Sequence, residues 1–383
     1  MRAILPLVRR GHGMTAPEKT ADEAAATTRV RGLRQRALNV RNHLAQRLAP
    51  VEDSILSTEA GLAGEFRSGA SVGGLRALFD SVTSLLNVRL PKFGRLVSGI
   101  EIGPDTTATI DLLVPDGPGP FPVLIYLHGG AWVAGSPASH RKLTARFAEK
   151  GFLVLSVDYR LAPEHPFPAG LEDCVQAVYW ATEHAVRFGG DPARIAIGGD
   201  SAGANLACAT AGLLAGRLTA PKLSAALLIY GVFDMSDMGS SSANRFIHRA
   251  YLQGDTPEQL ADPRVSPISW ADRLPPCFVV VGTQDSLLVQ NRRLRDALAT
   301  AQIPHHYIEE ATMPHGFMQM EFMGSARRVV QEAVEFLELH MAETPATRRR
   351  RLFLSLWIRL RKSVTRLLQR RATRAARRWR PTP

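Results

Sequence analysis

The segment IAIGGDSAGANL, Ile195 to Leu206, joins a short apolar run to a stretch rich in alanine and leucine. Its Gly-x-Ser-x-Gly pattern is weak by itself, because average glycine and serine frequencies produce it by chance in roughly one chain in ten of this length. The context is more informative. Residues 194–198 predict the end of a strand and residues 202–214 a buried helix, so Ser201 falls on a strand-to-helix turn.

Two glycines flank this serine at the spacing that a tight, strained turn requires. Gly199 and Gly203 tolerate unusual backbone angles and leave room for neighbouring chain. The helix that follows directs its positive end at Ser201, where developing negative charge is stabilised. The segment therefore predicts a serine nucleophile.

Short apolar segments alternate with helical patterns over most of the chain. The expected strands cover 122–127, 152–157, 194–198, 225–233, 277–282 and 305–310, and the expected helices cover 144–150, 169–186 and 202–214. Strands that are apolar on both faces and linked by helices are typical of a mostly parallel sheet covered on both sides. We therefore expect an α/β fold.

Two residues are suitable partners for the serine. A serine hydroxyl needs a base to take its proton and a third group to orient that base. In parallel-sheet hydrolases the partners follow later strands, with the acid before the histidine. Asp285 follows the strand at 277–282, and His315 lies in the turn PHG after the strand at 305–310. We expect His315 to be the base and Asp285 to orient it.

Other acids and histidines remain as alternatives. The rival acids are Asp200, Asp234, Glu309 and Glu310. Asp234 is the strongest rival because it follows the strand after the nucleophile, whereas Asp200 is adjacent to the serine and would point elsewhere. His305 and His306 fall within a predicted strand and His184 on a helix, which favours His315.

An oxyanion hole is expected after the strand at 122–127. Acyl transfer needs donors aimed at the tetrahedral oxyanion, and backbone N–H groups commonly supply them. Gly129 and Gly130 in the sequence HGG let the backbone approach a substrate closely, and the N–H of Ala202 directly follows the nucleophile. We predict these three N–H groups as the oxyanion hole.

Five short motifs occur together in the order and spacing of a known family. They are HGGAW at 128–132, YRLAPE at 159–164, GDSAG at 199–203, Asp285 after VGTQ, and PHGF at 314–317. The chain resembles the hormone-sensitive-lipase-like branch of the α/β-hydrolase esterases over about residues 50–342. The resemblance implies an eight-stranded, mostly parallel sheet with a helical cap, a triad of Ser201, Asp285 and His315, and cofactor-free hydrolysis of carboxylic esters.

The chain departs from the family pattern in two places. Many relatives follow the acid with Pro-Leu-x-Asp, whereas Asp285 is followed by Ser-Leu-Leu-Val. The basic residues after 343 are also outside the pattern. No metal and no cofactor are expected, since no CxxC or Cys/His cluster occurs and Cys174, Cys208 and Cys277 lie far apart in apolar segments typical of buried thiols.

Composition changes along the chain indicate several regions. Residues 1–50 form a basic, polar segment; 51–100 contain amphipathic stretches suited to a helical cap; 101–342 form the catalytic core; and 343–383 form an arginine-rich tail. A cap insertion is expected within 236–260. We expect the side chains of 51–100 and of this insertion to line the substrate pocket.

The net charge of +12 is unevenly distributed. Residues 344–383 contribute +14 and residues 1–47 contribute +7, which leaves residues 48–343 at −9. The predicted catalytic domain is thus acidic and its ends are basic. The first ten residues contain only a short apolar stretch broken by Pro6, so no secretory signal and a cytoplasmic location are expected. Met14 is an alternative start.

The tail from 348 to 380 combines arginines with apolar residues at helical spacing. The apolar set is Phe353, Leu356, Trp357, Leu360, Val364, Leu367 and Leu368. A basic helix with a leucine and tryptophan face favours an anionic membrane surface and hence peripheral association. Nucleic-acid binding is disfavoured, because it would not explain the apolar face, and a disordered solubilising tail is the remaining alternative.

These observations predict a serine carboxylic ester hydrolase that acts on a small-molecule ester or acylglycerol. Amidase or deacetylase action on a specific metabolite is an open alternative within the hydrolases. A non-catalytic ligand-binding protein on the same fold is disfavoured, because it would lack part of the triad. Homo-oligomers are compatible with the sequence.

Overall fold

The computed structural model describes residues 70–238 and 242–343, together with 345, 349 and 353. The chain divides into two compact units, Met1–Leu48 and Ala49–Pro383, and every described residue belongs to the second. The basic segment expected at 1–50 and nearly all of the arginine-rich tail at 343–383 therefore lie outside the described residues.

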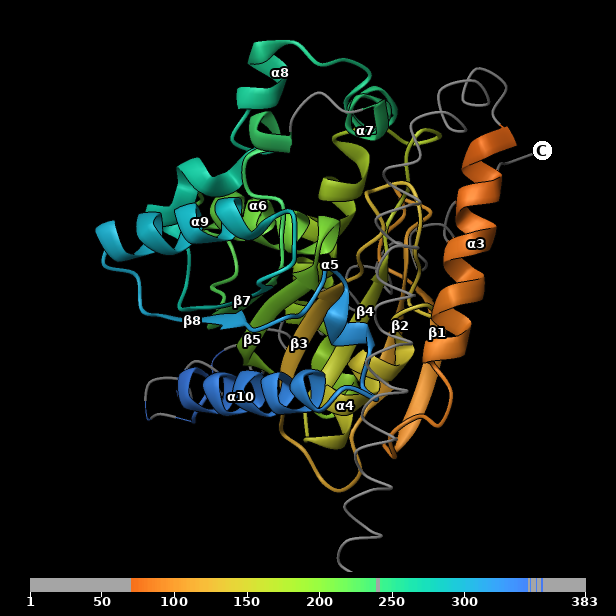
Figure 1. Ribbon diagram of the computed structural model, residues 1–383. Coiled ribbons are helices and arrows are strands. Elements are labelled where there is room, and N and C mark those ends of the chain that lie inside the picture. Colours follow the sequence, from red (N-terminus) through yellow and green to blue (C-terminus); the bar gives the residue numbers. More distant parts are fainter. Residues whose placement is uncertain (1–69, 239–241, 344, 346–348, 350–352, 354–383) are drawn as a thin grey trace, which may run out of the picture. The chain divides into compact units, whose positions relative to one another are not determined.

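The described residues form an eight-stranded sheet in the order β1-β2-β4-β3-β5-β6-β7-β8 (Figure 1). The strands are β1 (Arg95–Glu101), β2 (Thr109–Val114), β3 (Phe121–Leu127), β4 (Leu153–Asp158), β5 (Gly190–Asp200), β6 (Ala225–Ile229), β7 (Cys277–Gly282) and β8 (His305–Glu310). Strand β2 pairs antiparallel with both β1 and β4, and the other neighbours are parallel. The expected mostly parallel α/β sheet is confirmed.

Helices cover both faces of this sheet. The main ones are α4 (Arg141–Glu149), α5 (Ala169–His184), α6 (Ala202–Ala215), α9 (Leu288–Thr300) and α10 (Gly324–His340). Helices α5 and α6 contact each other and β5, whereas α4 contacts β4 and α10 (Figure 1). Short 3₁₀ segments follow α5 (η2, Ala185–Phe188), precede β7 (η4, Pro267–Arg273) and follow β8 (η5, Phe317–Gln319).

Burial on both faces explains the apolar strands. Every residue of β6 and β7 is buried, because helices cover both sides of the parallel sheet. Strand β6 ends at Ile229, earlier than the expected 233, because Tyr230 has a positive φ of 37° that interrupts the extended chain. Strand β5 begins at Gly190, earlier than the expected 194.

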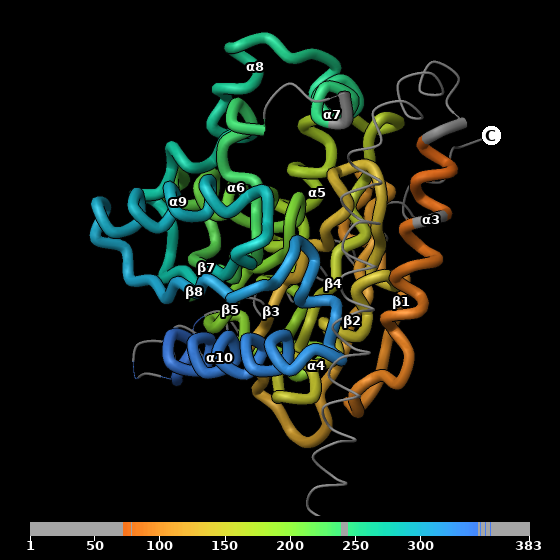
Figure 2. Tube along the Cα trace, in the orientation of Figure 1, coloured from red at the N-terminus to blue at the C-terminus, as the bar shows by residue number. Residues whose placement is uncertain are grey.

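The segment between β6 and β7 contains helices. They are η3 (Met235–Met238), α7 (Ser242–Leu252) and α8 (Pro257–Ala261). Thr256 starts α8 with a capping box shared with Gln259. In Figure 2, α7 and α8 lie at the top of the view, above α5 and α6.

Helix α3 (Ala70–Leu86) lies within the expected cap region. Its Arg76 donates hydrogen bonds to both carboxylate oxygens of Glu164, at 2.8 and 2.7 Å, and to the carbonyl oxygens of Val133 and Ala162. The sheet begins with β1 at Arg95, before the expected core boundary at 101, because the edge strand pairs with β2. In the part of the chain that the structure describes, no helix has the length and apolarity needed to cross a membrane.

Candidate active site

The predicted nucleophile lies on a strained turn between β5 and α6. Ser201 has φ of 53° and ψ of −120°, which is rare for a residue with a side chain. This position is at the carboxyl end of β5, next to β3, where the order of strands reverses along the sheet. Open α/β sheets bind ligands at such a switch point.

The glycines around Ser201 are needed for space. A Cβ on Gly203 would lie 2.0 Å from the carbonyl oxygen of Leu127, and one on Gly199 would lie 2.4 Å from the same atom. Neither glycine has a positive φ; the unusual backbone angles occur at Ser201 itself. The expectation that these glycines relieve backbone angles is thus wrong, whereas the expectation that they leave room for neighbouring chain is confirmed.

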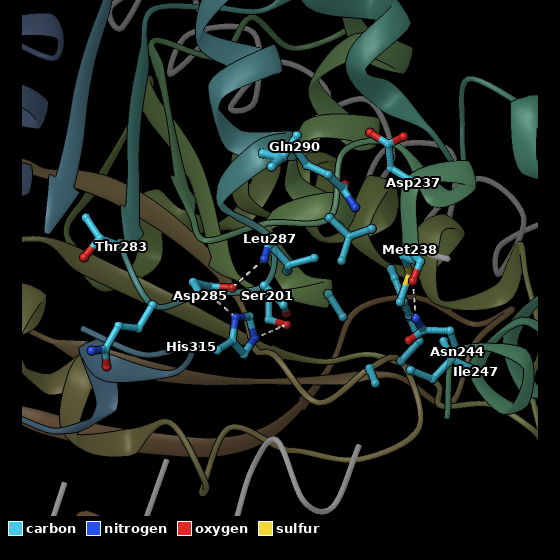
Figure 3. Close-up of a pocket in the computed structure, with 17 residues that line it drawn as sticks. Ser201, Asp237, Met238, Asn244, Ile247, Thr283, Asp285, Leu287, Gln290 and His315 are labelled. Atoms are coloured by element: carbon cyan, nitrogen blue, oxygen red, sulfur yellow. Dashed lines mark hydrogen bonds and ion pairs between the residues drawn. The ribbon is translucent and has the colours of Figure 1, made fainter. Parts of the chain in front are cut away.

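Three predicted residues meet within hydrogen-bonding distance (Figure 3). His315 Nε2 lies 2.9 Å from Ser201 Oγ, and His315 Nδ1 lies 2.8 Å from Asp285 Oδ2. The neutral tautomer that satisfies both contacts carries its proton on Nδ1, donates it to the carboxylate, and accepts the serine hydroxyl proton at Nε2. This is the arrangement that a general base requires.

Asp285 and His315 are held from several sides. The second carboxylate oxygen of Asp285 accepts a hydrogen bond from the N–H of Leu287 at 2.8 Å, and the Asp285 side chain is inaccessible to solvent. The ring of Tyr230 packs edge-on against the imidazole of His315, with 4.9 Å between centroids. The loop after His315 is fastened to α4 by two hydrogen bonds from Arg146 to Glu321, at 2.8 and 3.0 Å.

The rival acids and histidines have other partners. Asp234 pairs with Arg293, Glu309 with Arg292 and Glu310 with Arg328. His305 contacts the carbonyl oxygen of Ile303, His306 stacks on Phe278, and His184 packs against Trp180. None of these contacts brings a rival to Ser201.

The predicted oxyanion hole needs one correction. The N–H of Gly129 donates to Asp200 Oδ1 at 3.2 Å and approaches His140 Nε2 at 3.3 Å, so it is already used inside the protein. No described residue accepts a hydrogen bond from the N–H of Gly130 or Ala131, and Ala131 lines the cavity beside Ser201. Gly129 is therefore a support of the loop, and Ala131 takes its place as a candidate donor.

Backbone geometry explains how the loop presents these donors. Gly130 has φ of 125°, and a Cβ there would lie 2.2 Å from the carbonyl oxygen of Ala134. Ala131 and Trp132 follow with φ of 51° and 61°. The turn is closed by hydrogen bonds from the N–H groups of Val133 and Ala134 to the Gly130 carbonyl oxygen. Three consecutive residues with positive φ turn the chain back from the sheet.

A buried polar cluster lies behind this loop, and sequence reasoning missed it. Asp200 accepts hydrogen bonds from Tyr126 Oη at 2.8 Å and from Gly129 N, and its other oxygen lies 3.2 Å from His140 Nε2. Burial opposes its charged form, but His140 and the two side-chain hydrogen bonds outweigh burial and lower the pKa of Asp200. Asp200 is the aspartate of GDSAG; no motif marks His140.

His128 is the second histidine of this region. Burial, together with the nearby His140, lowers the pKa of His128 to about 3, so its imidazole is neutral at physiological pH. The ring stacks on Tyr159 at 4.3 Å between centroids, and Tyr159 Oη donates to the His128 carbonyl oxygen at 2.7 Å. The histidine of HGG thus anchors the loop through packing.

A cavity of about 920 Å³ opens over the serine (Figure 3). Its walls comprise Ala131, Trp132, Ser201, Ala202, Val232, Asp237, Met238, Asn244, Ile247, Thr283, Gln284, Asp285, Ser286, Leu287, Val289, Gln290 and His315. The expected contribution of 236–260 is confirmed by Asp237, Met238, Asn244 and Ile247. The expected contribution of 51–100 is wrong for its described part, because none of residues 70–100 lines the cavity and Arg76 of α3 instead bonds to the carbonyl oxygens of Val133 and Ala162.

The three cysteines are buried free thiols, as expected. Burial raises the pKa of Cys174 and of Cys277 well above the ordinary value, which makes a thiolate nucleophile there unfavourable. Among the described residues, no group of three or more His, Cys, Asp or Glu side chains could hold a metal ion.

Comparisons with known proteins agree with this geometry. A family model described as the alpha/beta hydrolase fold matches residues 124–319. The carboxylic ester hydrolase LipN of Mycobacterium tuberculosis is 32% identical over 250 residues, which is 60% of this chain and 66% of LipN. The carboxylesterase NlhH of the same organism is 35% identical over 215 residues, or 52% of this chain and 67% of NlhH. The chain thus spans about two thirds of the length of each relative.

A solved structure matches a larger fraction of the chain. An ester hydrolase from the metagenome of Lake Arreo superposes with a TM-score of 0.67 and 31% identity. The match covers 78% of this chain and 98% of that one.

Proposed function

Because the chain belongs to the α/β-hydrolase fold family and is a carboxylic ester hydrolase, we propose that Ser201, His315 and Asp285 form its catalytic triad. The observation that carries the proposal is the continuous chain of contacts from Ser201 Oγ through both ring nitrogens of His315 to Asp285. The contacts also weigh against a non-catalytic binding protein, for which such alignment would serve no purpose.

The proposed reaction proceeds through an acyl-enzyme. Ser201 Oγ attacks the ester carbonyl carbon while His315 Nε2 takes the hydroxyl proton, and Asp285 stabilises the imidazolium. The C–O bond to the alcohol then breaks as His315 returns the proton to the leaving oxygen. Water then attacks the acyl carbon while His315 takes its proton. The bond from the acyl carbon to Ser201 Oγ breaks, His315 returns the proton to Oγ, and the carboxylic acid leaves.

The oxyanion of the tetrahedral intermediate is assigned to three backbone donors. They are the N–H groups of Gly130, Ala131 and Ala202. Ala202 begins α6, so its N–H has no acceptor within the helix and lies at the positive end of the helix dipole. Donors held in place before reaction stabilise the transition state without a reorganisation cost.

The triad is tested by replacing its nucleophile and its acid. Ser201→Ala is expected to lower kcat for a chromogenic acyl ester roughly 10⁴-fold or more, and Asp285→Asn about 10⁴-fold through the wrong histidine tautomer. Ser84→Ala on the exposed face of α3 is the matched control. Full activity in purified Ser201→Ala would exclude the mechanism.

The substrate is a small-molecule ester, and its acyl length is the next question. A cavity of about 920 Å³ has room for short and long acyl chains alike, so the preference is measured as kcat/KM over a panel of esters from two to sixteen acyl carbons. Acylglycerols are the alternative if long chains are preferred. The same panel with amide analogues distinguishes an esterase from an amidase.

The tail supports a further part of the proposal, peripheral membrane association. Residues 348–380 carry arginines around an apolar helical pattern, which suits an interface rich in anionic lipid. The full chain is expected to pellet with vesicles containing phosphatidylserine, and a variant with the tail arginines changed to glutamine should remain in the supernatant. Equal pelleting of both forms would contradict a role for the tail.

A further inference from the structure

One wall of the cavity carries a buried amide whose orientation is determined by its partners. Gln290 lies at the start of α9 and is only 3% exposed. The backbone N–H groups of Phe233 and Asp234 both approach the same side-chain atom, at 3.0 and 3.1 Å. Two N–H donors require an acceptor, so this atom is the carbonyl oxygen and the other atom is the NH₂ nitrogen.

The NH₂ group of Gln290 therefore remains as a donor at the cavity. Figure 3 shows the amide extending from α9 toward the interior of the cavity, which Gln290 lines together with Met238 and Leu287. A buried amide donor gains a hydrogen bond when a ligand supplies an oxygen, and a ligand that covers it without an acceptor incurs a desolvation cost. The cavity thus favours ligands that place an oxygen acceptor beside the NH₂ group of Gln290.

The charges around the cavity restrict which acceptor fits. Among the residues that the structure describes, the lining contains Asp237 and Asp285 and neither lysine nor arginine, and the Asp285 carboxylate is already paired with His315. Arg293 pairs with Asp237 and Asp234 from α9 but is not among the lining residues. An anionic substituent would find no cationic partner among the described wall residues and would face the Asp237 carboxylate, whereas a neutral oxygen has only the amide to satisfy.

We propose that Gln290 is a specificity-determining residue that selects esters with a second, neutral oxygen acceptor, such as a ketone, ether or further ester carbonyl. The inference rests on the proposed triad, because it describes the substrate of that site. The acceptor lies on the arm of the substrate that reaches from Ser201 to α9.

Substrates matched in shape test this selection. For the acyl arm, 4-nitrophenyl 4-oxopentanoate carries a carbonyl oxygen where 4-nitrophenyl 4-methylpentanoate carries a methyl group. For the alcohol arm, 2-methoxyethyl acetate carries an ether oxygen where butyl acetate carries a methylene group. Each kcat/KM is divided by the rate constant for alkaline hydrolysis. The wild-type ratio of oxygen-bearing to apolar ester is expected to be about tenfold on one arm, as for one well-placed hydrogen bond.

Gln290→Glu is the decisive variant. One carboxylate oxygen can keep both backbone N–H donors, while the other replaces the NH₂ donor with an acceptor. The ratio is expected to fall to about one or below at pH 8. Gln302→Glu makes the same chemical change at an exposed position after α9 and is expected to keep the wild-type ratio.

The outcomes separate this inference from the proposed function. A wild-type ratio near one on both arms, or an unchanged ratio in Gln290→Glu, would overturn the role of Gln290 while Ser201→Ala remains inactive. Retained activity in Ser201→Ala would instead overturn the triad. Because the readout is a ratio within one protein sample, a partly misfolded Gln290→Glu preparation still gives an answer.

Discussion

The nucleophile region and the cavity wall are built in different ways. Around Ser201 the contacts are made by backbone atoms, because Gly199 and Gly203 pack directly against the end of β3. The carboxylate of Asp200 is buried beside His140. The wall formed by η3 and α7 is attached mainly by side chains, including the ion pairs of Arg293, whose side chain is 47% exposed. The difference indicates that the reaction centre tolerates little change, whereas the wall can vary and adjust selectivity.

The largest effect is expected from a methyl group in the nucleophile region. Gly203→Ala would place a Cβ 2.0 Å from the carbonyl oxygen of Leu127 and 2.6 Å from that of His128, which are backbone atoms that cannot turn away. We expect a loss of about 3 kcal/mol in the free energy of unfolding, together with loss of activity. Urea denaturation measures the loss.

Gly216 provides the matched control at the other end of α6. A Cβ there would meet its nearest atom at 3.7 Å, and its φ of −73° suits any residue. Gly216→Ala should change stability by no more than about 0.5 kcal/mol. Equal stability of the two variants would show that the contact of the turn with β3 is looser than described.

An intermediate effect is expected from pH, through His128. Its folded-state pKa of about 3 lies below the unfolded value near 6.5, so the unfolded chain binds one more proton between these pH values. Stability is therefore complete above about pH 6.5 and falls as the pH decreases toward 3. The His128 contribution to the loss between pH 7 and 5 is about 2 kcal/mol.

His128→Gln isolates this contribution because an amide does not titrate. Urea denaturation of both proteins at pH 7 and pH 5 should show a smaller loss for the variant, by about 2 kcal/mol. The comparison cancels the carboxylates that both proteins share. If both lost the same stability, His128 would be protonated in the folded protein near its ordinary pKa.

The smallest effect is expected in the cavity wall. Arg293→Met removes the partner of Asp234 and Asp237 at the surface, and exposed ion pairs contribute less than about 1 kcal/mol. KM is expected to rise about two- to threefold, because Asp237 lines the cavity and loses its counter-charge. Arg295→Met is the control, because its ion pairs with Asp296 and Glu309 and its stacking on Tyr307 involve no residue that lines the cavity. A loss of several kcal/mol would mean that the wall is as tightly built as the nucleophile region.

The outcome for individual residues shows what local patterns can predict. Strands β7 and β8 were predicted with their observed ends, because each is a short run followed at once by a turn. The positions of Asp285 and His315 were predicted for a similar reason, since each lies in the loop that follows a strand of the parallel sheet. Gly129 was misassigned because its N–H is used by Asp200, 71 residues away in the chain, and no local pattern reports that hydrogen bond.

The sequence by itself determined the parallel sheet, the family resemblance and the identity of the three residues Ser201, His315 and Asp285 that contact one another in series. These depend on periodicity and on residues next to strand ends, where short-range chemistry decides the structure. Only the tertiary structure decided which N–H groups face the cavity, that α7 rather than α3 forms its wall, and how Gln290 is oriented. Each of these depends on hydrogen-bond partners from distant segments, and folding alone brings those partners together.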